Sequence, residues 1–235
     1  MVRIHNRRYS PEEITVLLFK KLRPRLLVGG FLFGGTNMSK NKNKLYALIG
    51  SALLGAVGFV LMAIEISVPI MPAFIKLDFS ELPALIASFA YGPLYGVAVC
   101  FVKNFLHLFI TNTAGVGELA NFLMGVFFVV PAGLVYGKIK NRKGALLGSL
   151  LGSLVMGVAC VFINLFITYP IYYQILIPEQ VILSMYQAIL PSVDSILKSL
   201  LIFNLPFTFA KGILVSIICF VVYKKLSPIL KSKIS

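Results

Sequence analysis

The stretch that decides the fold runs from Phe203 to Tyr223 and reads FNLPFTFAKGILVSIICFVVY. It is apolar apart from a few small polar residues and one cation, Lys211. The next basic residues, Lys224 and Lys225, lie on the order of 20 Å away along a helix, too far for the Lys211 ammonium to reach that surface. A cation at membrane depth is costly and by default indicates a functional site with a polar partner.

The composition of the whole chain is that of a polytopic membrane protein. Of its 235 residues, 58% are hydrophobic and only 13% are charged, and the mean hydropathy is +0.91. Soluble domains are nearer half apolar and a quarter charged. The net charge of +14 does not indicate nucleic-acid binding, because the basic residues form short clusters beside apolar spans. Cys100, Cys160 and Cys219 are isolated within apolar segments, which favours buried single residues over a disulfide framework or metal site.

Residues 1–37 differ from the rest of the chain. They hold seven of the 22 Lys and Arg residues, and their apolar run, 26–33, is too short to span a membrane. Codons for Gly34 and Gly35 can contain a ribosome-binding sequence shortly before Met38. We therefore hypothesise that translation starts at Met38 and that residues 1–37 are leader; a mobile basic tail is the alternative. Native protein whose intact mass begins at Met1 would refute the hypothesis.

Hydrophobic runs predict an all-α domain of six membrane spans within residues 38–235. The expected spans cover about 44–66, 79–92, 93–111, 117–138, 143–170 and 199–224, the second being short. The connections 67–78 and 171–198 are semi-apolar, and their prolines exclude continuous helix. We expect both connections to lie at the membrane interface or to fold back over the bundle.

The basic residues predict the orientation of these spans. Eleven of the fifteen Lys and Arg residues after Met38 precede the first span, separate the fourth from the fifth, or follow the sixth. Because cytoplasmic loops carry the excess of Lys and Arg, we expect both termini in the cytoplasm and the protein in the bacterial plasma membrane. The acidic residues after Met38 then lie toward the outer side: Glu65, Asp78, Glu81, Glu118, Glu179 and Asp194.

Polar side chains gather in the outer halves of the fifth and sixth spans. Asn164 lies near the outer end of the fifth, and Thr208 lies three residues before Lys211, so Thr208 and Lys211 share a helix face. An amide, a hydroxyl and an ammonium among aromatic rings suit a planar ligand rich in heteroatoms. The rings concerned are Phe203, Phe207, Phe209 and Tyr169. Alternatively, or in addition, Lys211 pairs with an outer carboxylate such as Glu118 or Asp194.

The loop from Phe74 to Pro83 mixes charged and aromatic residues at the outer surface. Asp78 is expected to N-cap the helix that follows, and Glu81, three residues later, to complete a capping-box-like arrangement. Closure of this loop over a ligand is the alternative interpretation of the same residues.

Two spans carry small residues at four-residue spacing. In the first span these are Ala47, Ser51 and Gly55, with Ala52 and Ala56 alongside, and in the fifth they are Gly144, Gly148 and Gly152. Such faces let helices approach closely in lipid, either inside the bundle or against another membrane subunit. Because both spans show the same spacing, the pattern alone does not choose between these interpretations.

Motifs for catalysis are not visible in the sequence. It has no Walker motif, no cluster of His and Cys, and no nucleophile–base pair, so nothing indicates an enzyme, a cofactor or an energy source of its own. His107, the only histidine after Met38, is expected to be a packed, hydrogen-bonded side chain.

Four segments together resemble the riboflavin-binding S component of energy-coupling factor (ECF) transporters, the RibU family. They are 76–83, 117–122, 164–172 and 205–212. The resemblance implies a six-helix protein that binds its vitamin at the outer face and uses no ATP itself. It implies a transmembrane coupling subunit and two cytoplasmic ATPases as partners. Riboflavin or its phosphate would be the transported ligand, not a cofactor, and membrane lipid, not nucleic acid, the further partner.

The resemblance also implies roles for individual residues. Asn164 and Lys211 match the family residues that contact the polar edge of the isoalloxazine ring. Thr208 stands where the family usually has a second asparagine, and it keeps a donor and an acceptor on a shorter side chain. Leu77 and Asp78 match the loop that covers the flavin. The predicted site also includes Phe74, Tyr169 and Phe207.

On the first span, Ala52 and Ala56 match the family face that meets the coupling subunit, and we include Ser51 and Gly55 in the expected interface. Two alternatives to a riboflavin importer remain: an S component for another vitamin, such as thiamine, and a stand-alone secondary transporter. The latter predicts two related halves with broken helices, and the sequence shows no internal repeat.

Overall fold

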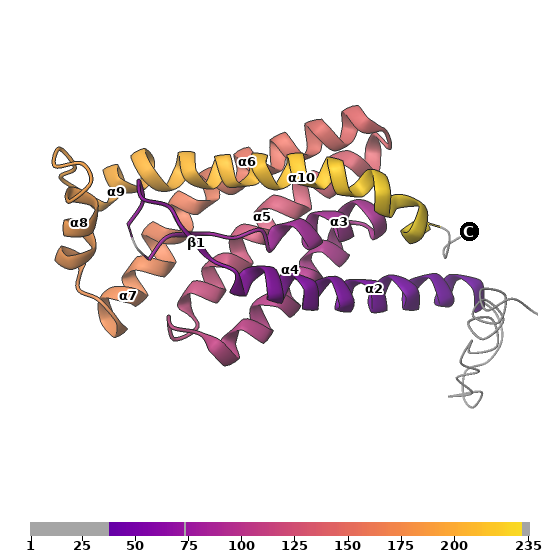
Figure 1. Ribbon diagram of the computed structural model, residues 1–235, viewed down its shortest axis with the longest axis horizontal. Helices are drawn as coiled ribbons and strands as arrows, with labels where there is room; N and C mark the ends of the chain where they lie inside the picture. Colours follow the sequence, from indigo (N-terminus) through magenta and orange to yellow (C-terminus); the bar gives the residue numbers. More distant parts are fainter. Residues whose placement is uncertain (1–37, 73, 232–235) are drawn as a thin grey trace, which may run out of the picture. The chain divides into compact units, whose positions relative to one another are not determined.

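A computed structural model describes residues 38–72 and 74–231 (Figure 1). From Ser39 onward these residues form one compact helical unit. The predicted leader, residues 1–37, lies outside the described residues, so the start at Met38 stays a prediction. The predicted all-α class is confirmed, and the described residues add one small two-stranded hairpin.

Among the described residues, five helical segments are long and apolar enough to cross a membrane. They lie in α2 (Met38–Ala63); α4 (Pro93–His107) with the 3₁₀ turn η1 (Leu108–Ile110); α5 (Val116–Lys138); α6 (Arg142–Ile163) continued by η2 (Asn164–Thr168) and α7 (Tyr169–Ile175); and α9 (Ile196–Ser199) continued by η3 (Leu200–Asn204) and α10 (Leu205–Lys231). The second predicted span is α3 (Glu81–Tyr91), whose 11 residues extend roughly 16 Å. Six full crossings therefore stay a prediction.

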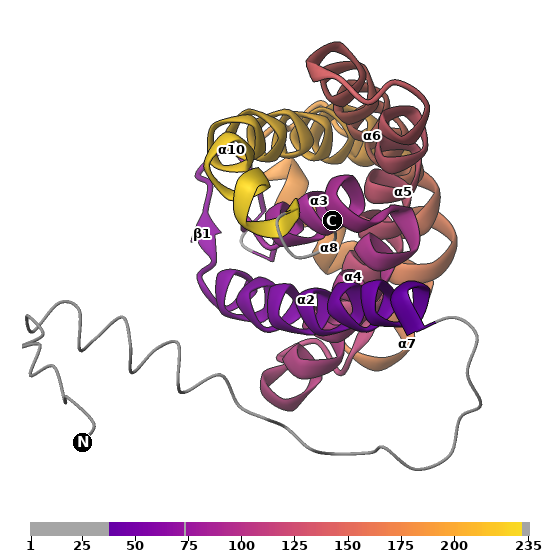
Figure 2. The same cartoon turned by 90° about the vertical axis from the view of Figure 1, so that its right-hand side faces the viewer.

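The short helix α3 lies at the centre of the bundle. Viewed along the long axis, α2, α4, α5, α6 and α10 are arranged around it (Figure 2). Ala84, Leu85 and Ala87 of α3 are completely buried, and they pack in one core with Val99 of α4 and Val215 of α10. A helix that is covered on all sides needs no polar face, which explains the nearly continuous apolar sequence of α3.

The glycine row on α6 packs inside the bundle. A side chain at Gly148 would lie 2.6 Å from the carbonyl oxygen of Ala132, and one at Gly152 would lie 2.5 Å from that of Phe128. Because side chains do not fit at such distances, glycine is what allows α6 to lie directly on the backbone of α5. For this row, internal packing is the correct interpretation.

The small residues on α2 divide between two faces. Ser51 is buried, and a side chain at Gly55 would meet Val102 of α4 at 2.6 Å. Ala52 and Ala56 lie on the exposed face of the helix. Their own chain therefore covers Ser51 and Gly55, and it leaves Ala52 and Ala56 exposed. The partner interface stays a prediction for all four residues.

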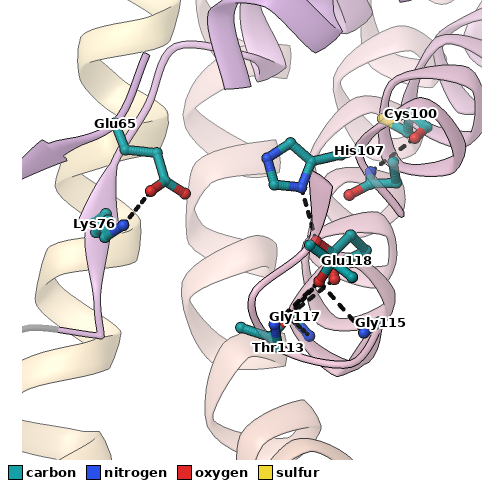
Figure 3. Close-up of polar contacts among 10 residues, drawn as sticks. Glu65, Lys76, Cys100, His107, Thr113, Gly115, Gly117 and Glu118 are labelled. Carbon is teal, nitrogen blue, oxygen red and sulfur yellow. Dashed lines mark hydrogen bonds and ion pairs between the residues drawn. The ribbon is translucent and has the colours of Figure 1, made fainter. Parts of the chain in front are cut away.

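A hairpin connects α2 with α3. Its strands β1 (Ile66–Ser67) and β2 (Lys76–Leu77) pair antiparallel. The Lys76 ammonium forms an ion pair with Glu65, which directly precedes β1 (Figure 3). This hairpin brings Asp78, at the end of β2, to the start of α3.

The connection 171–198 folds back over one end of the bundle, as expected. It forms α7, α8 (Glu179–Gln187) and the short α9, which lie together at that end (Figure 1). Ile182 and Tyr186 of α8 pack with Tyr169 and Leu200 in a second buried cluster. We call the segment from α7 to α9 the cap.

Two π-helical turns join the cap to the bundle. In η2 the N–H of Tyr169 donates to the carbonyl of Asn164, and in η3 the N–H of Leu205 donates to that of Leu200. Each bond spans five residues instead of four. Such wide turns are rare and are frequently found at functional sites.

A proline follows each wide turn, Pro170 after η2 and Pro206 after η3. A proline inside a regular α-helix removes a hydrogen bond and collides with the carbonyl four residues earlier, and a wider turn relieves that collision. The fifth span was expected to end at about residue 170, at the Tyr169–Pro170 pair. It continues instead to Ile175, because η2 accommodates Pro170 without breaking the helix.

Candidate ligand-binding site

A cavity of about 160 Å³ lies between the hairpin, α3, α5, the η2 end of α6 and the η3–α10 segment. Its wall is part polar and part apolar, and the polar part holds two ammonium groups, two carboxylates and three amides. These groups belong to Lys76 and Lys211, Asp78 and Glu81, and Asn121, Asn164 and Asn204. Phe74, Tyr169, Tyr172 and Phe207 supply the aromatic part.

The structure brings most of the predicted site together at this cavity. The lining includes Asn164, Thr208, Lys211, Asp78, Phe74, Tyr169 and Phe207. Leu77, in β2, is not among the described lining residues, and Phe203 packs in the cap cluster instead. That these side chains bind a ligand stays a prediction at this point.

Lys211 forms an ion pair with Asp78 across the cavity. The Lys211 Nζ donates to the Asp78 Oδ2 at 2.8 Å, and the two side chains are 11% and 10% exposed. The sequence predicts an outer carboxylate as the partner of Lys211, with Glu118 and Asp194 as candidates. The partner is a different outer carboxylate, Asp78. The two candidate carboxylates pair with His107 and Lys198.

The ion pair determines the charge state of Asp78. Burial alone raises the pKa of this carboxyl. The neighbouring ammonium groups of Lys211 and Lys103 and the hydrogen bonds from Lys211 and Ser80 outweigh burial, and they lower the pKa from 3.8 to about 2. Asp78 is therefore ionised throughout the physiological pH range.

Asn164 and Thr208 meet at Cys160. The Asn164 Nδ2 donates to the Cys160 carbonyl at 2.9 Å and lies 3.1 Å from its Sγ, and the Thr208 Oγ1 donates to the same Sγ at 3.2 Å. No hydrogen bond among the described residues uses the Asn164 Oδ1. The Asn164 Oδ1 is therefore available to accept a hydrogen bond from a ligand.

Lys103 of α4 is a second buried cation, and the sequence reasoning missed it. Its side chain has no exposed surface, and its Nζ donates to the Glu81 Oε1 and the Ser80 Oγ at 2.6 Å each. The signal was present, because Lys103 interrupts an apolar span in the same way as Lys211. Each of these cations holds one carboxylate of the segment 78–81.

The capping box predicted for Asp78 and Glu81 does not form. Ser80 is the N-cap residue of α3 and makes no side-chain cap bond. The Asp78 Oδ1 accepts the N–H of Ser80 at 2.9 Å, and the Glu81 carboxylate is paired with Lys103. The prediction was wrong because two buried ammonium groups attract these carboxylates more strongly than backbone N–H groups do.

Asn121, Thr168 and Asn204 also line the cavity, although the predicted site does not include them. The Asn121 Oδ1 and the Thr168 Oγ1 are buried and have no hydrogen-bond partner within the described part of the chain. Buried polar atoms are normally paired, so these two orphans indicate that the cavity receives a polar molecule. The segments 117–122 and 164–172 were singled out in the sequence, but these two side chains were not.

A separate polar cluster surrounds Glu118 at the start of α5 (Figure 3). The Glu118 Oε1 lies 2.7 Å from the His107 Nδ1, and its Oε2 accepts a hydrogen bond from the Thr113 Oγ1 at 2.9 Å. The expectation that His107 is a packed, hydrogen-bonded side chain is confirmed. Among the residues that the structure describes, His, Cys, Asp and Glu form no group able to hold a metal ion.

Comparisons with known proteins agree with this arrangement. The sequence model of the family "ECF transporter, substrate-specific component" matches residues 46–223. The riboflavin transporter RibU of Staphylococcus aureus (strain TCH60) is 32% identical over 196 residues, which make up 83% of this chain and 95% of that protein. The riboflavin transporter FmnP of Bacillus subtilis (strain 168) is 33% identical over 189 residues, or 79% and 94% of the two chains.

A solved structure of the S component of a bacterial ECF transporter has the same fold. It is 30% identical, its TM-score is 0.63, and the match covers 80% of this chain and 99% of that one. S components are integral membrane parts of transporters and not enzymes. Since the family match extends over most of the sequence, the chain belongs to the family of substrate-specific (S) components of ECF transporters.

Proposed function

We propose that this S component binds riboflavin in the polar cavity and delivers it inward together with a transmembrane coupling subunit and two cytoplasmic ATPases. The observation that carries the proposal is the convergence of Asn164, Thr208 and Lys211 on a cavity closed by Asp78. Support for riboflavin as the ligand comes from the two relatives, both of which are riboflavin transporters.

The unused hydrogen-bond donors and acceptors in the cavity wall suit the polar edge of an isoalloxazine ring. The Lys211 ammonium is a donor for a ring carbonyl, and the Asn164 Oδ1 is an acceptor for a ring N–H. The rings of Phe74 and Tyr169 lie 6.4 Å apart at 75° and offer apolar surface to the ring faces. Thr208 already donates its hydroxyl proton to Cys160, so it has only an acceptor to offer a ligand.

The cavity has to widen to take up a flavin. At about 160 Å³ it is smaller than the roughly 300–1,000 Å³ typical of sites for drug-sized ligands. The Lys211–Asp78 pair joins α10 to the segment after β2, so separating these two side chains opens the space between them. Binding would then exchange one charge-assisted hydrogen bond of Lys211 for another.

The proposed orientation follows from the charges at the two ends of the bundle. The first turns of α2, the α5–α6 connection and the last turns of α10 lie at one end (Figure 1). The α5–α6 connection carries Lys138, Lys140 and Arg142, so we place this end in the cytoplasm. The cap and the cavity then face outward, and the exposed Ala52 and Ala56 of α2 are the proposed contact for the coupling subunit.

Flavin titration of the purified protein in detergent tests the proposal. Riboflavin fluorescence should be quenched saturably, with one flavin bound per chain, and thiamine should not compete. Competition by thiamine would favour an S component for another vitamin. Riboflavin uptake by cells that lack the ATPase subunits would instead favour a stand-alone secondary transporter.

A further inference from the structure

Asn204 occupies a position in the cavity wall that the predicted site does not include. It is the last residue of η3, 6% exposed, and lies one helical turn before Thr208. At spacings of four and seven residues, Asn204, Thr208 and Lys211 follow one another along the same face of the helix. The amide of Asn204 is therefore presented to the same space as the Lys211 ammonium.

A directional chain of hydrogen bonds orients this amide. The Tyr186 hydroxyl donates to the Asn204 Oδ1 at 2.7 Å, and the Tyr169 hydroxyl lies 2.6 Å from the Tyr186 hydroxyl. A phenol has one proton, and that of Tyr186 is used on Asn204, so Tyr169 donates to Tyr186. Both tyrosines are buried, which holds the Asn204 Oδ1 toward α8.

This orientation leaves the Asn204 Nδ2 and its two protons for the cavity. No hydrogen bond among the described residues uses that nitrogen. Thr168, in the facing π-turn η2, has a buried hydroxyl without a partner in the same wall. A buried hydroxyl without a partner is unfavourable, so Thr168 indicates a polar molecule in the cavity, and the Asn204 Nδ2 is a donor available to it.

The donors and acceptors alternate along the wall. Asn164 and Thr208 both touch the Cys160 Sγ, so Asn164 lies level with Thr208 and between Asn204 and Lys211. The free groups then read donor (Asn204 Nδ2), acceptor (Asn164 Oδ1) and donor (Lys211 Nζ). The pyrimidine edge of a flavin presents carbonyl, N–H and carbonyl, the complementary order.

We infer that Asn204 is a further ligand-binding residue, whose amide donates a hydrogen bond to a ring carbonyl of the flavin, and that Tyr186 and Tyr169 are positioning residues for this amide. The inference rests on the proposed function and assigns one of its ligand contacts. It also explains why threonine is tolerated at position 208, where the family usually has an asparagine. The Thr208 hydroxyl donates to Cys160, and Asn204 supplies an amide one turn away.

The substitution Asn204→Asp separates this role from a structural one. Aspartate keeps the oxygen that accepts from Tyr186 but loses both N–H donors. We expect the Kd for riboflavin to rise at least ~10-fold in Asn204→Asp, and by a similar factor in Asn204→Leu. The matched control is Asn141→Asp at the start of α6, where the oxygen that accepts from the Gly144 N–H is also kept; its Kd should equal that of the wild type.

Wild-type affinity in Asn204→Asp with loss only in Asn204→Leu would show that Asn204 merely accepts from Tyr186, and would overturn the inference. A wild-type protein that binds no flavin would instead overturn the proposed function. Lumichrome, which keeps the ring carbonyls but lacks the ribityl chain, should lose affinity for Asn204→Asp by the same factor as riboflavin; a loss confined to riboflavin would refute the ring contact.

The positioning role has its own readout. Tyr186→Phe removes the hydroxyl that holds the Asn204 Oδ1, and we expect a smaller rise in Kd, about 3- to 10-fold. In the Asn204→Asp background the same change should have little further effect, because the donor that Tyr186 orients is already gone. An equal loss in both backgrounds would show that Tyr186 acts through the cap alone.

Discussion

Two lysines inside the bundle have the same kind of partner but different surroundings. Lys103 donates to Glu81 and Ser80, and its side chain has no exposed surface. Lys211 pairs with Asp78 at similar distance, but its side chain is 11% exposed and lines a polar cavity. At Lys103 the ammonium lies outside the cavity lining and only its partner Glu81 borders the cavity, whereas at Lys211 both the ammonium and the Asp78 carboxylate line the cavity.

The comparison shows that a cation in an apolar span is not by itself a binding residue. Each ammonium neutralises one carboxylate of the segment 78–81, so together the two lysines fix the entry to α3. Of the two ammonium groups only that of Lys211 lines the cavity, so our proposal lets Lys211 alone exchange its partner for a ligand atom. We therefore propose that Lys103 contributes to stability alone and that Lys211 contributes to both stability and binding.

The largest expected effect is on stability, at the Lys103–Glu81 pair. Lys103→Met leaves the Glu81 carboxylate buried without its cation, and breaking a buried pair typically costs about 3–5 kcal/mol of unfolding free energy. We expect a strongly lowered melting temperature in detergent. The double variant Glu81→Gln with Lys103→Met removes both charges and should recover part of the loss. A Lys103→Met protein as stable as the wild type would remove the distinction between the two lysines.

The next effect is on binding, at the accessible pair. Lys211→Met removes a charged donor to the ligand, and hydrogen bonds to charged groups contribute about 1.5–3 kcal/mol, so we expect riboflavin to bind roughly 10- to 150-fold more weakly. Fluorescence titration measures this change. Lys198→Met is the matched control, because it removes an equal charge from an exposed pair with Asp194 outside the cavity lining. Equal losses in both variants would point to general electrostatics.

The smallest effect is the dependence on acid pH that Asp78 confers. Its pKa is lowered from 3.8 to about 2, so the stabilisation is complete above the ordinary pKa and is lost as the pH falls toward the lowered one. The wild type should lose about 2 kcal/mol of unfolding free energy between about pH 4 and pH 2 through this group. Thermal denaturation measures the loss, which should be much smaller in Lys211→Met. The same loss in both proteins would exclude Lys211 as the cause.

Much of the fold could be predicted from hydropathy. The five membrane-length segments and the short α3 follow directly from where the apolar runs begin and end. The continuation of the fifth span past Pro170 was not predicted, because a proline normally marks the end of a helix, whereas here the wide turn η2 accommodates it. The choice between Ser51 and Ala52 as outward residues also needed the structure, since both lie on a small-residue face.

The part of the site that could be predicted consists of polar residues that stand out in apolar stretches of the sequence. Lys211 stood out as a cation in an apolar run, and Asn164 and Thr208 were found near it. Lys103 met the same criterion and was overlooked. Asn204 lies four residues before Thr208, so helical spacing alone could have placed both on one face. The two tyrosines that orient its amide are distant in the sequence, and only the structure shows that they contact it.

The most direct test of the account is the stabilisation of the protein by riboflavin. At free riboflavin roughly 100 times the wild-type Kd, bound ligand should raise the unfolding free energy of the wild type and of Lys198→Met by about 2.7 kcal/mol. At the same concentration Lys211→Met, with a Kd about 100-fold weaker, should gain only about 0.4 kcal/mol. An equal gain in Lys211→Met, or no gain in the wild type, would contradict the claim that Lys211 marks the ligand site.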